Sequence, residues 1–423
     1  MTRILLVGLG VVGRAIALAH LRLGIPVDVL DVDAAAIDRF AAPVDGLPET
    51  SPWKIENVES PLPGLFAARI SPAVASSPKT FSDEDPPVLL IESIAERVDL
   101  KKQFFASAQR SLPSTSLFCS NTSTLPIATL ARELPHPGRV AGMHFFMPVD
   151  HRDAVEVIAT SATEPAAVRQ AVRHARRLRK QPILVGDAVG FVVNRLLAPY
   201  LNEAITLLCR HARAEQIRDA AVAFGMPLSP LELVDLIGIR TAFDGGRSYW
   251  QAFPRRMTTA PLLPALIKRG RLGRHAGGGF FDYPNDGGGE PIDRVAPADE
   301  TIELVRRYTR NGRSWTIDQI HHRLATTMWT EAACILHDGI VNDLERIDAA
   351  MSGGLGYRRE PGQSAVPFLS HMDRLGIEII RGQLGGDDPI HAPEWLRERL
   401  DRIGDVRPGS PGPTEVLRSI QRP

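Results

Sequence analysis

The chain opens with Arg3-Ile4-Leu5-Leu6-Val7-Gly8-Leu9-Gly10-Val11-Val12-Gly13, and this stretch decides the fold. Residues 3–7 are typical of a buried strand, and residues 14–20 are typical of a helix. Between them Gly8, Gly10 and Gly13 form a GxGxxG turn. In such a turn the first glycine permits the tight bend, the second lets a diphosphate approach the backbone, and the third allows close helix–strand packing. Because the helix N-terminus attracts negative charge, the stretch predicts a dinucleotide-binding fold.

A second apolar strand ends in an acidic residue. Residues 27–30 run into Asp31, which lies eighteen positions after Gly13 (31 − 13). A carboxylate at this place accepts hydrogen bonds from ribose hydroxyls and repels a 2′-phosphate. The sequence therefore predicts NAD, rather than NADP, as the cofactor. The alternative is a glycine turn that is purely structural.

Polar residues follow two further apolar strands. Glu92 and Glu96 come after the strand 88–91, and the polar cluster 120–124 comes after the strand 116–119. Open α/β sheets bind ligands at the carboxyl ends of parallel strands, so these side chains are expected to lie near a site. Part of the cluster is also expected to cap the next helix. Residues 34–87, rich in proline and poor in periodicity, are interpreted as an irregular excursion from the sheet that could serve as a lid.

A histidine and a glutamate stand in two neighbouring apolar strands. His144 and Glu156 are twelve positions apart (156 − 144), which suits two strands joined by a turn around residues 150–152. A carboxylate beside an imidazole fixes its tautomer and raises its basicity. The pair is therefore a candidate general base. The alternative is a histidine that only satisfies a core position.

The composition excludes several classes of function. The 423 residues predict two or three domains, and 49 basic against 49 acidic residues give no indication of a nucleic-acid partner or an anionic membrane. Cys119, Cys209 and Cys334 have no metal-ligand spacing, so reduced, buried thiols and no metal site are expected. We find no signal peptide and no run approaching the roughly 18 apolar residues of a membrane span. A soluble cytoplasmic protein is expected.

From residue 192 onward the pattern is helical and repeats. Residues 195–225 match residues 323–354 with an offset of 128 (323 − 195; 331 − 203) that becomes 129 (348 − 219). The fold class is therefore α/β, with a Rossmann-type doubly wound sheet followed by two related all-α domains. The expected divisions are an NAD-binding domain, a first helical domain that closes on substrate and cofactor, a second helical domain, and an extended or wrapping tail rich in Pro, Arg and Asp. Their bounds are 1–186, 187–290, 291–385 and 386–423.

Together these stretches resemble the 3-hydroxyacyl-CoA dehydrogenase family. Residues 120–123 resemble its SNTS motif, residues 142–148 (GMHFFMP) its GLHFFNP, residues 190–196 (GFVVNRL) its GFIVNRL, and residues 279–283 (GFFDY) its GFYDY. The doubled helical region resembles the dehydrogenase half of multifunctional fatty-acid oxidation enzymes, without the hydratase half. The resemblance covers residues 1–33, 88–283 and, more loosely, 318–380.

The resemblance implies a reaction and its residues. His144 would take the substrate hydroxyl proton while C3 gives hydride to NAD, and Glu156 would orient His144. Ser123 and Asn194 would contact the substrate. Glu96 and Lys101 match cofactor-side positions. The implied substrate is a small molecule of the acyl-CoA type, as in fatty-acid β-oxidation.

The same resemblance bears on partners. With both helical copies in one chain, a monomer or a dimer is expected, and association with a separate hydratase or thiolase is open. Neither nucleic acid nor membrane insertion is expected.

Three departures from the family pattern keep other functions open. Met147 stands where the family has an asparagine near the nicotinamide, and His275 stands where a lysine or arginine usually precedes the glycine loop. Residues 34–87 lack the helical arm that holds CoA in the family. One alternative is a dehydrogenase of a small 3-hydroxy acid or a carnitine-like molecule. The other is a cofactor-binding protein that has lost turnover.

Overall fold

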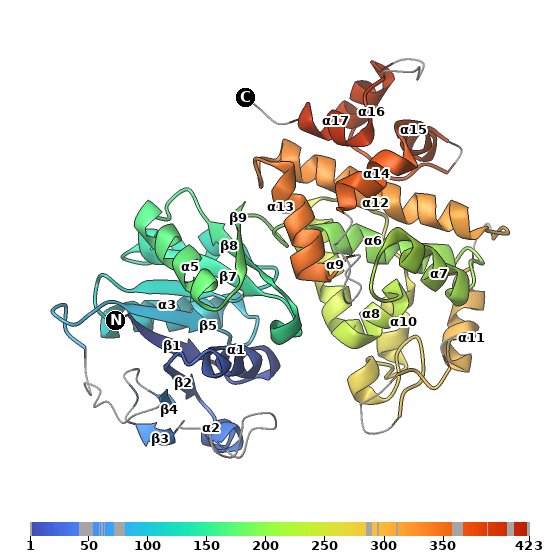
Figure 1. Ribbon diagram of the computed structural model, residues 1–423. Coiled ribbons are helices and arrows are strands. Elements are labelled where there is room, and N and C mark those ends of the chain that lie inside the picture. Colours follow the sequence, from blue (N-terminus) through green and yellow to red (C-terminus); the bar gives the residue numbers. More distant parts are fainter. Residues whose placement is uncertain are drawn as a thin grey trace. The chain divides into compact units, whose positions relative to one another are not determined.

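The computed structural model divides the chain into two compact units, Met1–Phe191 and Val192–Pro423, which we call the first and the second unit (Figure 1). It describes residues 2–41, 54–58, 60, 62, 64–71, 81–284, 290–293, 296–309, 312–357, 367–386, 388–403 and 410–420, with the backbone alone at 41, 54–58 and 66–71. Within these residues no helix is both long and apolar enough to cross a bilayer.

A nine-stranded sheet forms the centre of the first unit within the described residues, in the order β3-β4-β2-β1-β5-β6-β7-β8-β9. The strands are β1 (Arg3–Val7), β2 (Val27–Asp31), β3 (Lys54–Val58), β4 (Phe66–Ser71), β5 (Val88–Glu92), β6 (Leu117–Ser120), β7 (Val140–Phe145), β8 (Ala154–Ala159) and β9 (Gln181–Gly186). From β2 to β7 the neighbouring strands are parallel, whereas β8 runs antiparallel to β7 and parallel to β9. The chain order reverses between β1 and β5, which makes that edge the topological switch point of the sheet.

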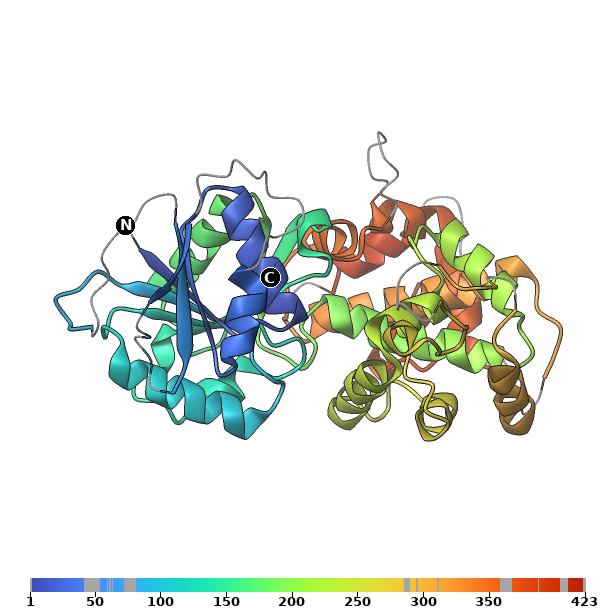
Figure 2. The same ribbon diagram turned by 90° about the horizontal axis from the view of Figure 1, so that it is seen from below.

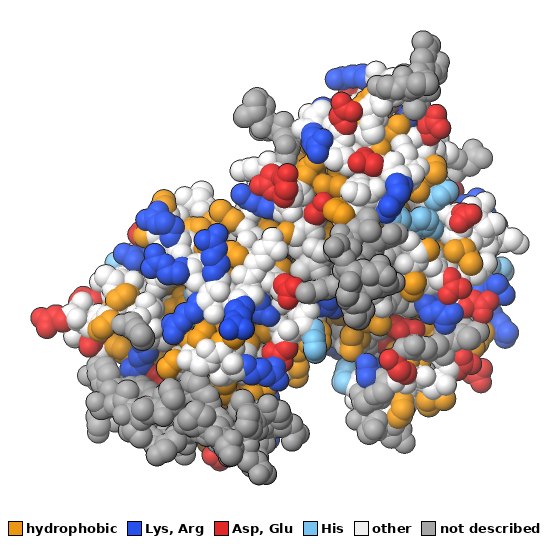
Figure 3. Space-filling view, viewed as in Figure 1, with side chains coloured by type: hydrophobic (Ala, Val, Ile, Leu, Met, Phe, Trp, Pro, Cys, Tyr) orange, Lys and Arg blue, Asp and Glu red, His pale blue; other side chains and the backbone are white. Residues whose placement is uncertain are grey.

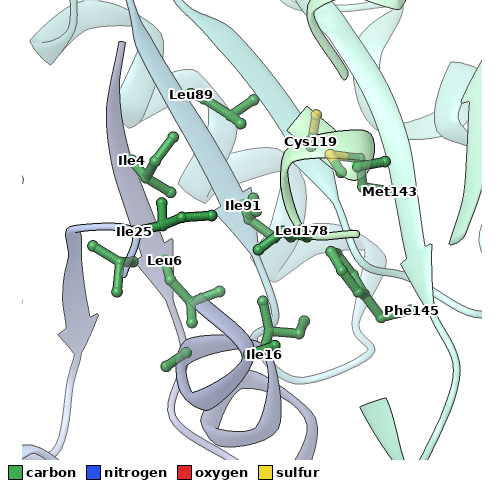
Figure 4. Packing of buried hydrophobic residues seen from close by; sticks show 14 of the residues in the cluster. Ile4, Leu6, Ile16, Ile25, Leu89, Ile91, Cys119, Met143, Phe145 and Leu178 are labelled. Atoms are coloured by element: carbon green, nitrogen blue, oxygen red, sulfur yellow. The ribbon is translucent and has the colours of Figure 1, made fainter. Parts of the chain in front are cut away.

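Helices cover both faces of this sheet (Figure 2). They are α1 (Val11–Arg22), α2 (Ala34–Ala41), α3 (Val98–Ser111), α4 (Ile127–Ala131) and α5 (Pro165–Arg177). Right-handed crossovers that leave the switch point in opposite directions place α1 on one face and α3 on the other. The helices α1 and α5 share one core cluster, in which Ile4, Ile91 and Met143 of the strands meet Ile16 and Leu178 (Figure 4). Burying such a side chain contributes roughly 1.5–3 kcal/mol, so this core holds the sheet edge in place.

Residues 34–87 differ from the expected irregular excursion. They contain α2 and the two strands β3 and β4, with β4 antiparallel to both β2 and β3. The strand β3 reads Lys-Ile-Glu-Asn-Val, and two apolar residues in five give a weak strand signal. The antiparallel pairing that defines it is not visible in the local pattern. Residues 42–53 and 72–80, which would form part of the proposed lid, lie outside the described residues.

The second unit is helical. Its helices are α6 (Val193–Leu208), α7 (Ala214–Phe224), α8 (Pro230–Ile237), α9 (Ile239–Ala252), α10 (Leu262–Lys268), α11 (Asp299–Tyr308), α12 (Ile317–His337), α13 (Leu344–Ala349), α14 (Phe368–Leu375), α15 (Ile377–Gly385), α16 (Glu394–Asp401) and α17 (Pro413–Arg418). The two longest, α6 and α12, occupy equivalent places in the repeat and pack against each other. The fold class expected from the sequence is confirmed, with a Rossmann-like sheet followed by a helical region.

The two copies of the repeat exchange ion pairs. Arg195 Nε donates to Glu331 Oε1 at 2.7 Å, and Arg323 Nε donates to Glu203 Oε1 at 2.5 Å. Arg195 and Arg323 are equivalent in the repeat, as are Glu203 and Glu331, so the arginine of each copy binds the glutamate of the other. Both arginines are buried. The copies therefore face each other across an approximate two-fold relation.

The C-terminal residues differ from the expected extended tail. The short helices α16 and α17 form there, and α17 packs on α14. They bury Leu396, Leu400, Val416 and Leu417, a pattern too short to stand out in a segment rich in Pro and Arg. Along the chain, the boundary between the two compact units falls after Phe191. The finer division into two helical domains remains a prediction.

Candidate active site

A cavity of about 510 Å³ opens at the switch point of the sheet. Its walls include Val7 at the end of β1, Asp31 at the end of β2 and Ser93 directly after β5, with Phe104 of α3 on another side. Open α/β folds bind ligands at this place, and the volume is typical of cofactor sites. Of the predicted cofactor residues, Gly8, Gly10 and Asp31 line this cavity.

The glycine turn shapes the floor of this cavity. Gly8 has a φ of +95°, and a Cβ there would lie 2.5 Å from the carbonyl oxygen of Ser93. A Cβ on Gly13 would lie 1.8 Å from the carbonyl oxygen of Gly8. By contrast, a Cβ on Gly10 would meet nothing within 4 Å. The open space therefore lies at Gly10, where α1 begins and its first amides point outward, as diphosphate binding requires.

Asp31 is held at the rim of the cavity. Its Oδ2 accepts a hydrogen bond from Leu9 N at 2.6 Å, and its Oδ1 accepts one from Asp33 N at 2.9 Å. An ionised carboxylate has further lone pairs that can accept ribose hydroxyls. Arg39 of α2 is paired with Asp33 at 2.9 Å and so is engaged away from Asp31. This arrangement fits NAD. The 2′-phosphate of NADP would lie beside the Asp31 carboxylate and be repelled by it.

A buried ion pair follows β5. Glu92 is fully buried and Lys101 of α3 is 1% exposed. Lys101 Nζ donates to Glu92 Oε1 at 2.5 Å and lies 3.2 Å from Glu96 Oε2. The second oxygen of Glu92 accepts from the Ser120 hydroxyl at 2.7 Å. Removing one member would leave a buried charge unpaired, typically at a cost of about 3–5 kcal/mol, so the network fixes the loop after β5.

Glu96 connects this network to the loop after β6. Its Oε1 accepts from Thr122 Oγ1 at 2.5 Å and from Ser123 N at 3.1 Å. Burial acts to raise the pKa of Glu96, but the charge of Lys101 and the Thr122 hydroxyl outweigh it, and the pKa is lowered. Glu96 is therefore an anion that positions the backbone of Ser123. The predicted residues Glu96 and Lys101 are brought together, although Lys101 is surrounded by protein acceptors.

His144 and Glu156 are direct cross-strand neighbours on β7 and β8. His144 Nδ1 lies 2.7 Å from Glu156 Oε2. Glu156 is fully buried, and His144 is 7% exposed. Because a carboxylate accepts at Nδ1, that nitrogen carries the hydrogen and Nε2 remains the basic nitrogen. The rings of Phe146 and Phe191 flank the imidazole with centroids at 4.8 and 5.9 Å.

Asn121 ties this pair to the cofactor cavity, a role that the sequence did not reveal. Its Oδ1 accepts from Phe145 N, directly after His144, at 2.9 Å. Its Nδ2 donates to the hydroxyl of Ser93, a wall residue of the cavity, at 3.2 Å. The only sequence signal was its place in the polar cluster after β6. The amide thus fixes the spacing between the imidazole and the cavity wall.

The cap of α4 also differs from expectation. Asp187, sixty positions after Ile127 (187 − 127), accepts from the backbone amides of Ile127 and Ala128, both at 2.7 Å. Within the polar cluster, the Thr122 hydroxyl accepts from Leu125 N at 3.0 Å, just before the helix begins. Burial raises the pKa of Asp187, against the effect of its two amide donors.

The remaining predicted groups have defined places. Ser123 is half-buried in the loop after β6 in the first unit. Asn194 is half-buried in the first turn of α6 in the second unit. Cys119, Cys209 and Cys334 are buried free thiols. No cluster of three or more metal-ligand side chains occurs in the part of the chain that the structure describes.

Two family models match the chain over residues 3–188 and 190–283. The NAD-binding domain of 3-hydroxyacyl-CoA dehydrogenases matches residues 3–188, and the C-terminal domain of the same enzymes matches residues 190–283. The chain belongs to the 3-hydroxyacyl-CoA dehydrogenase family. The resemblance seen in the motifs is thereby confirmed, as is NAD as the cofactor. The cavity at the switch point lies within the residues that the NAD-binding domain model matches.

Solved structures of this dehydrogenase family are similar to the chain. A 3-hydroxybutyryl-CoA dehydrogenase from Escherichia coli K12 has 23% identity and a TM-score of 0.68, covering 95% of this chain and 98% of that one. An (S)-3-hydroxybutyryl-CoA dehydrogenase from Ralstonia eutropha has 26% identity and a TM-score of 0.56, covering 67% and 99%. The dehydrogenase part of multifunctional enzyme 1 from C. elegans has 20% identity and a TM-score of 0.55, covering 91% and 84%.

Proposed function

We propose that the chain catalyses NAD-dependent oxidation of a 3-hydroxyacyl-CoA to the 3-ketoacyl-CoA, or the reverse reaction. The observation that carries this proposal is the 2.7 Å contact between His144 Nδ1 and Glu156 Oε2. The pair lies at the end of β7, and Asn121 connects it to the wall of the NAD cavity. The similarity to (S)-3-hydroxybutyryl-CoA dehydrogenase from Ralstonia eutropha supports a 3-hydroxyacyl thioester.

The chemistry assigned to the protein is a proton transfer. His144 Nε2 accepts the proton of the substrate 3-hydroxyl, and the buried Glu156 carboxylate stabilises the resulting imidazolium. Bound NAD supplies the hydride acceptor for C3. Ser123 and Asn194 are proposed to contact the substrate oxygen atoms. A general base of this kind typically contributes on the order of 10²–10⁴-fold to the rate.

A substrate panel tests the proposal. Purified protein is given NAD and, separately, 3-hydroxyacyl-CoAs of several chain lengths, the matching free 3-hydroxy acids, and carnitine, while NADH absorbance is followed. We expect turnover of the CoA thioesters and kcat/KM for the free acids and carnitine lower by at least about 100-fold, because remote binding energy contributes to catalysis. Comparable turnover of a free acid or carnitine would contradict the CoA assignment.

One observation favours an alternative. Met147, the second residue after the strand that carries His144, is 41% exposed, and its thioether cannot donate the hydrogen bond that the family asparagine can. A protein that binds NAD but does not turn over any compound of the panel would support loss of activity. NAD binding by calorimetry, measured alongside the panel, separates that outcome from a failure to bind the cofactor.

A further inference from the structure

The helix α5 presents an exposed face made of arginines. Arg169, Arg173, Arg176 and Arg177 of α5 and Arg179 directly after it are exposed, and we call these five residues the arginine face. No acidic residue occurs between residues 165 and 180. Figure 3 shows basic side chains gathered over this part of the first unit. The face is thus a strongly basic patch on a chain whose net charge is zero.

The arginine face is unpaired among the described residues, unlike other basic side chains of the same unit. Arg22 pairs with Asp150, Arg39 with Asp33, and Arg139 with Glu164. No ion pair within the described part of the chain involves a member of the face. The opposite side of α5, with Ala167, Ala171 and Ala175, is buried in the core. Because this side of α5 is packed in the core, the arginines are held on the exposed side of the helix.

The arrangement of these arginines is also self-repelling. Arg169 and Arg173 are four residues apart, as are Arg173 and Arg177, and like charges at this spacing destabilise a helix. The helix dipole favours the arginines of the last turn but not Arg169 or Arg173. An anionic partner would attract these guanidinium groups and so offset the repulsion between them.

The arginine face ends at the sheet edge that carries the reaction pair. Four residues after the end of α5 at Arg177, Gln181 begins β9 and pairs with Ala154 of β8, two residues before Glu156. Lys180 Nζ donates to the carbonyl oxygen of Arg152 at 2.6 Å, in the turn that follows His144. Four residues of chain, one strand spacing and two strand residues add up to at most roughly 25 Å between Arg177 and Glu156. A partner docked on the arginine face would therefore have to reach over no more than roughly 25 Å to this pair.

The chemistry of the face favours an acidic protein over other polyanions. None of the exposed large hydrophobic side chains of the described residues lies on α5, so nothing there inserts into a bilayer. The segment 165–180 contains no Phe, Tyr or Trp on which a base could stack, and its one imidazole, His174, is buried. From Arg169 to Arg177 the convex face is about 12 Å long, which matches a second helix. Guanidinium groups pair bidentately with carboxylates.

We propose that the arginine face docks a small acidic carrier protein that presents the 3-hydroxyacyl group as a thioester. This inference rests on the proposed function, because the carrier delivers the same thioester group to His144 that CoA delivers. The carrier would dock on α5 with its acidic helix and reach the sheet edge with its thioester arm. The transfer of proton and hydride is unchanged.

The test compares two forms of one substrate on the full-length protein. Wild type and the variant Arg173→Glu/Arg177→Glu are assayed with 3-hydroxybutyryl-acyl carrier protein and with 3-hydroxybutyryl-CoA. We expect the variant to raise KM for the carrier substrate by about tenfold or more, since steering by opposite charge is lost, and to change KM and kcat for the CoA substrate less than about twofold. Raising salt from about 0.05 M to about 0.3 M should likewise raise the KM of the wild type for the carrier substrate.

A matched control carries the same change of charge elsewhere. Arg306 of α11 and Arg418 of α17 are exposed, and neither forms an ion pair with a described residue. The variant Arg306→Glu/Arg418→Glu should behave as wild type with both substrates. Circular dichroism melts of both variants establish that they fold.

Binding of fluorescently labelled holo-carrier protein, followed by anisotropy, does not depend on turnover. The inference is overturned if the KM for the carrier substrate is equal in wild type and in the Arg173→Glu/Arg177→Glu variant, or if the carrier does not bind. In either case, turnover of 3-hydroxyacyl-CoA leaves the proposed function standing. Absence of turnover with either substrate overturns the proposed function. Binding of phosphatidylserine vesicles or of single-stranded RNA that depends on Arg173 and Arg177, without carrier binding, assigns the face to another polyanion and likewise overturns the inference.

Discussion

At the scale of single residues, His144 and Glu156 are expected to act as one unit. The variant His144→Gln should lower kcat by at least about 10²-fold, because it removes the general base. Glu156→Gln should lower kcat by a smaller factor, since it leaves the imidazole in place without the carboxylate that orients it. The double variant should lose little beyond His144→Gln alone. Steady-state kinetics and thermal melts on the three variants measure these effects.

His151 provides the control for that series. It is an exposed histidine in the turn after β7, so His151→Gln should leave kcat and the melting temperature unchanged. If His144 had only a structural role in the core, the variants would melt at lower temperature and keep an ordinary kcat. Their losses of stability would then be additive. A folded His144→Gln protein with near-normal kcat would remove this histidine from the mechanism.

Asp31 is expected to decide between NAD and NADP. Wild type should bind NAD in clear preference, because the carboxylate accepts ribose hydroxyls and repels a 2′-phosphate. Asp31→Asn should weaken NAD binding by about tenfold or more, since a hydrogen bond to a charged group typically contributes about 1.5–3 kcal/mol. Calorimetric titration of both cofactors into both proteins measures this. Equal or tighter NADP binding by the wild type would contradict the assignment.

Contacts that follow from local spacing could be predicted, and contacts that depend on distant partners could not. The glycines, Asp31, His144 and Glu156 stand in short patterns whose chemistry requires that spacing. Asn121 is different, because its two partners lie 24 and 28 positions away. Asp187 caps a helix that begins sixty positions earlier in the chain. Nothing in their own neighbourhoods indicates these partners.

At the scale of elements, α1 and α5 are joined by two buried histidines. His20 Nε2 lies 3.0 Å from His174 Nε2, while His20 Nδ1 donates to Ile16 O at 2.8 Å. His20 therefore accepts the hydrogen of His174. Burial lowers the pKa of His20 to about 4 and that of His174 well below its ordinary value. Both imidazoles are neutral in the folded protein.

This pair should make the fold sensitive to acid. Below an unfolded pKa of about 6.5 the unfolded chain binds protons that the folded pair does not, so stability falls as pH drops toward 4. From pH 7.5 to pH 5, His20 alone accounts for a loss of about 2 kcal/mol. Urea unfolding at both pH values measures the loss. The variant His20→Leu/His174→Leu should lose less stability over this interval, and an unchanged loss would contradict the assignment.

Two glycines of the second unit should respond to alanine in opposite directions. A Cβ on Gly279 would lie 2.0 Å from Asp235 Oδ1, which accepts from Phe280 N at 2.7 Å. Gly279→Ala should therefore displace the loop from α8 and destabilise the protein by more than about 1 kcal/mol. Gly245 within α9 meets nothing within 4 Å, so Gly245→Ala should stabilise by about 0.5–1 kcal/mol. Thermal melts distinguish the signs, and equal shifts would contradict the packing argument.

Apolar elements could be predicted, and polar ones could not. The strands β5 to β7 are almost continuous apolar runs, as buried parallel strands require. The strand β3 and the helices α16 and α17 contain many polar residues. Such elements owe their structure to pairing and packing with residues far away in the chain, which a local pattern does not record.

At the scale of the whole molecule, the exchanged ion pairs bind the two helical copies together. A fragment of residues 1–290 lacks Glu331, so the buried Arg195 loses its partner, and breaking such a pair typically costs about 3–5 kcal/mol. It also exposes the face of α6 that packs on α12. We expect this fragment to associate or aggregate, whereas the full chain should be a monomer or a dimer that uses another surface. Light scattering on both proteins measures this, and a monomeric, soluble fragment would show the expectation to be wrong.

The repeat was visible in the sequence, but the exchange of partners was not. Equal spacing of Arg and Glu in both copies is compatible with pairing inside each copy or between copies. Only the folded chain selects the second arrangement, in which Arg195 binds Glu331 and Arg323 binds Glu203.

An interface carried on one chain has a property that separate subunits cannot have. Subunits held by the same contacts come apart when the protein is diluted below their dissociation constant, and their stability then depends on concentration. Here the peptide chain keeps the partner of Arg195 and the partner of Arg323 at a constant local concentration. The environment that these pairs provide around α6 should therefore be the same in a dilute assay as in a crowded cell.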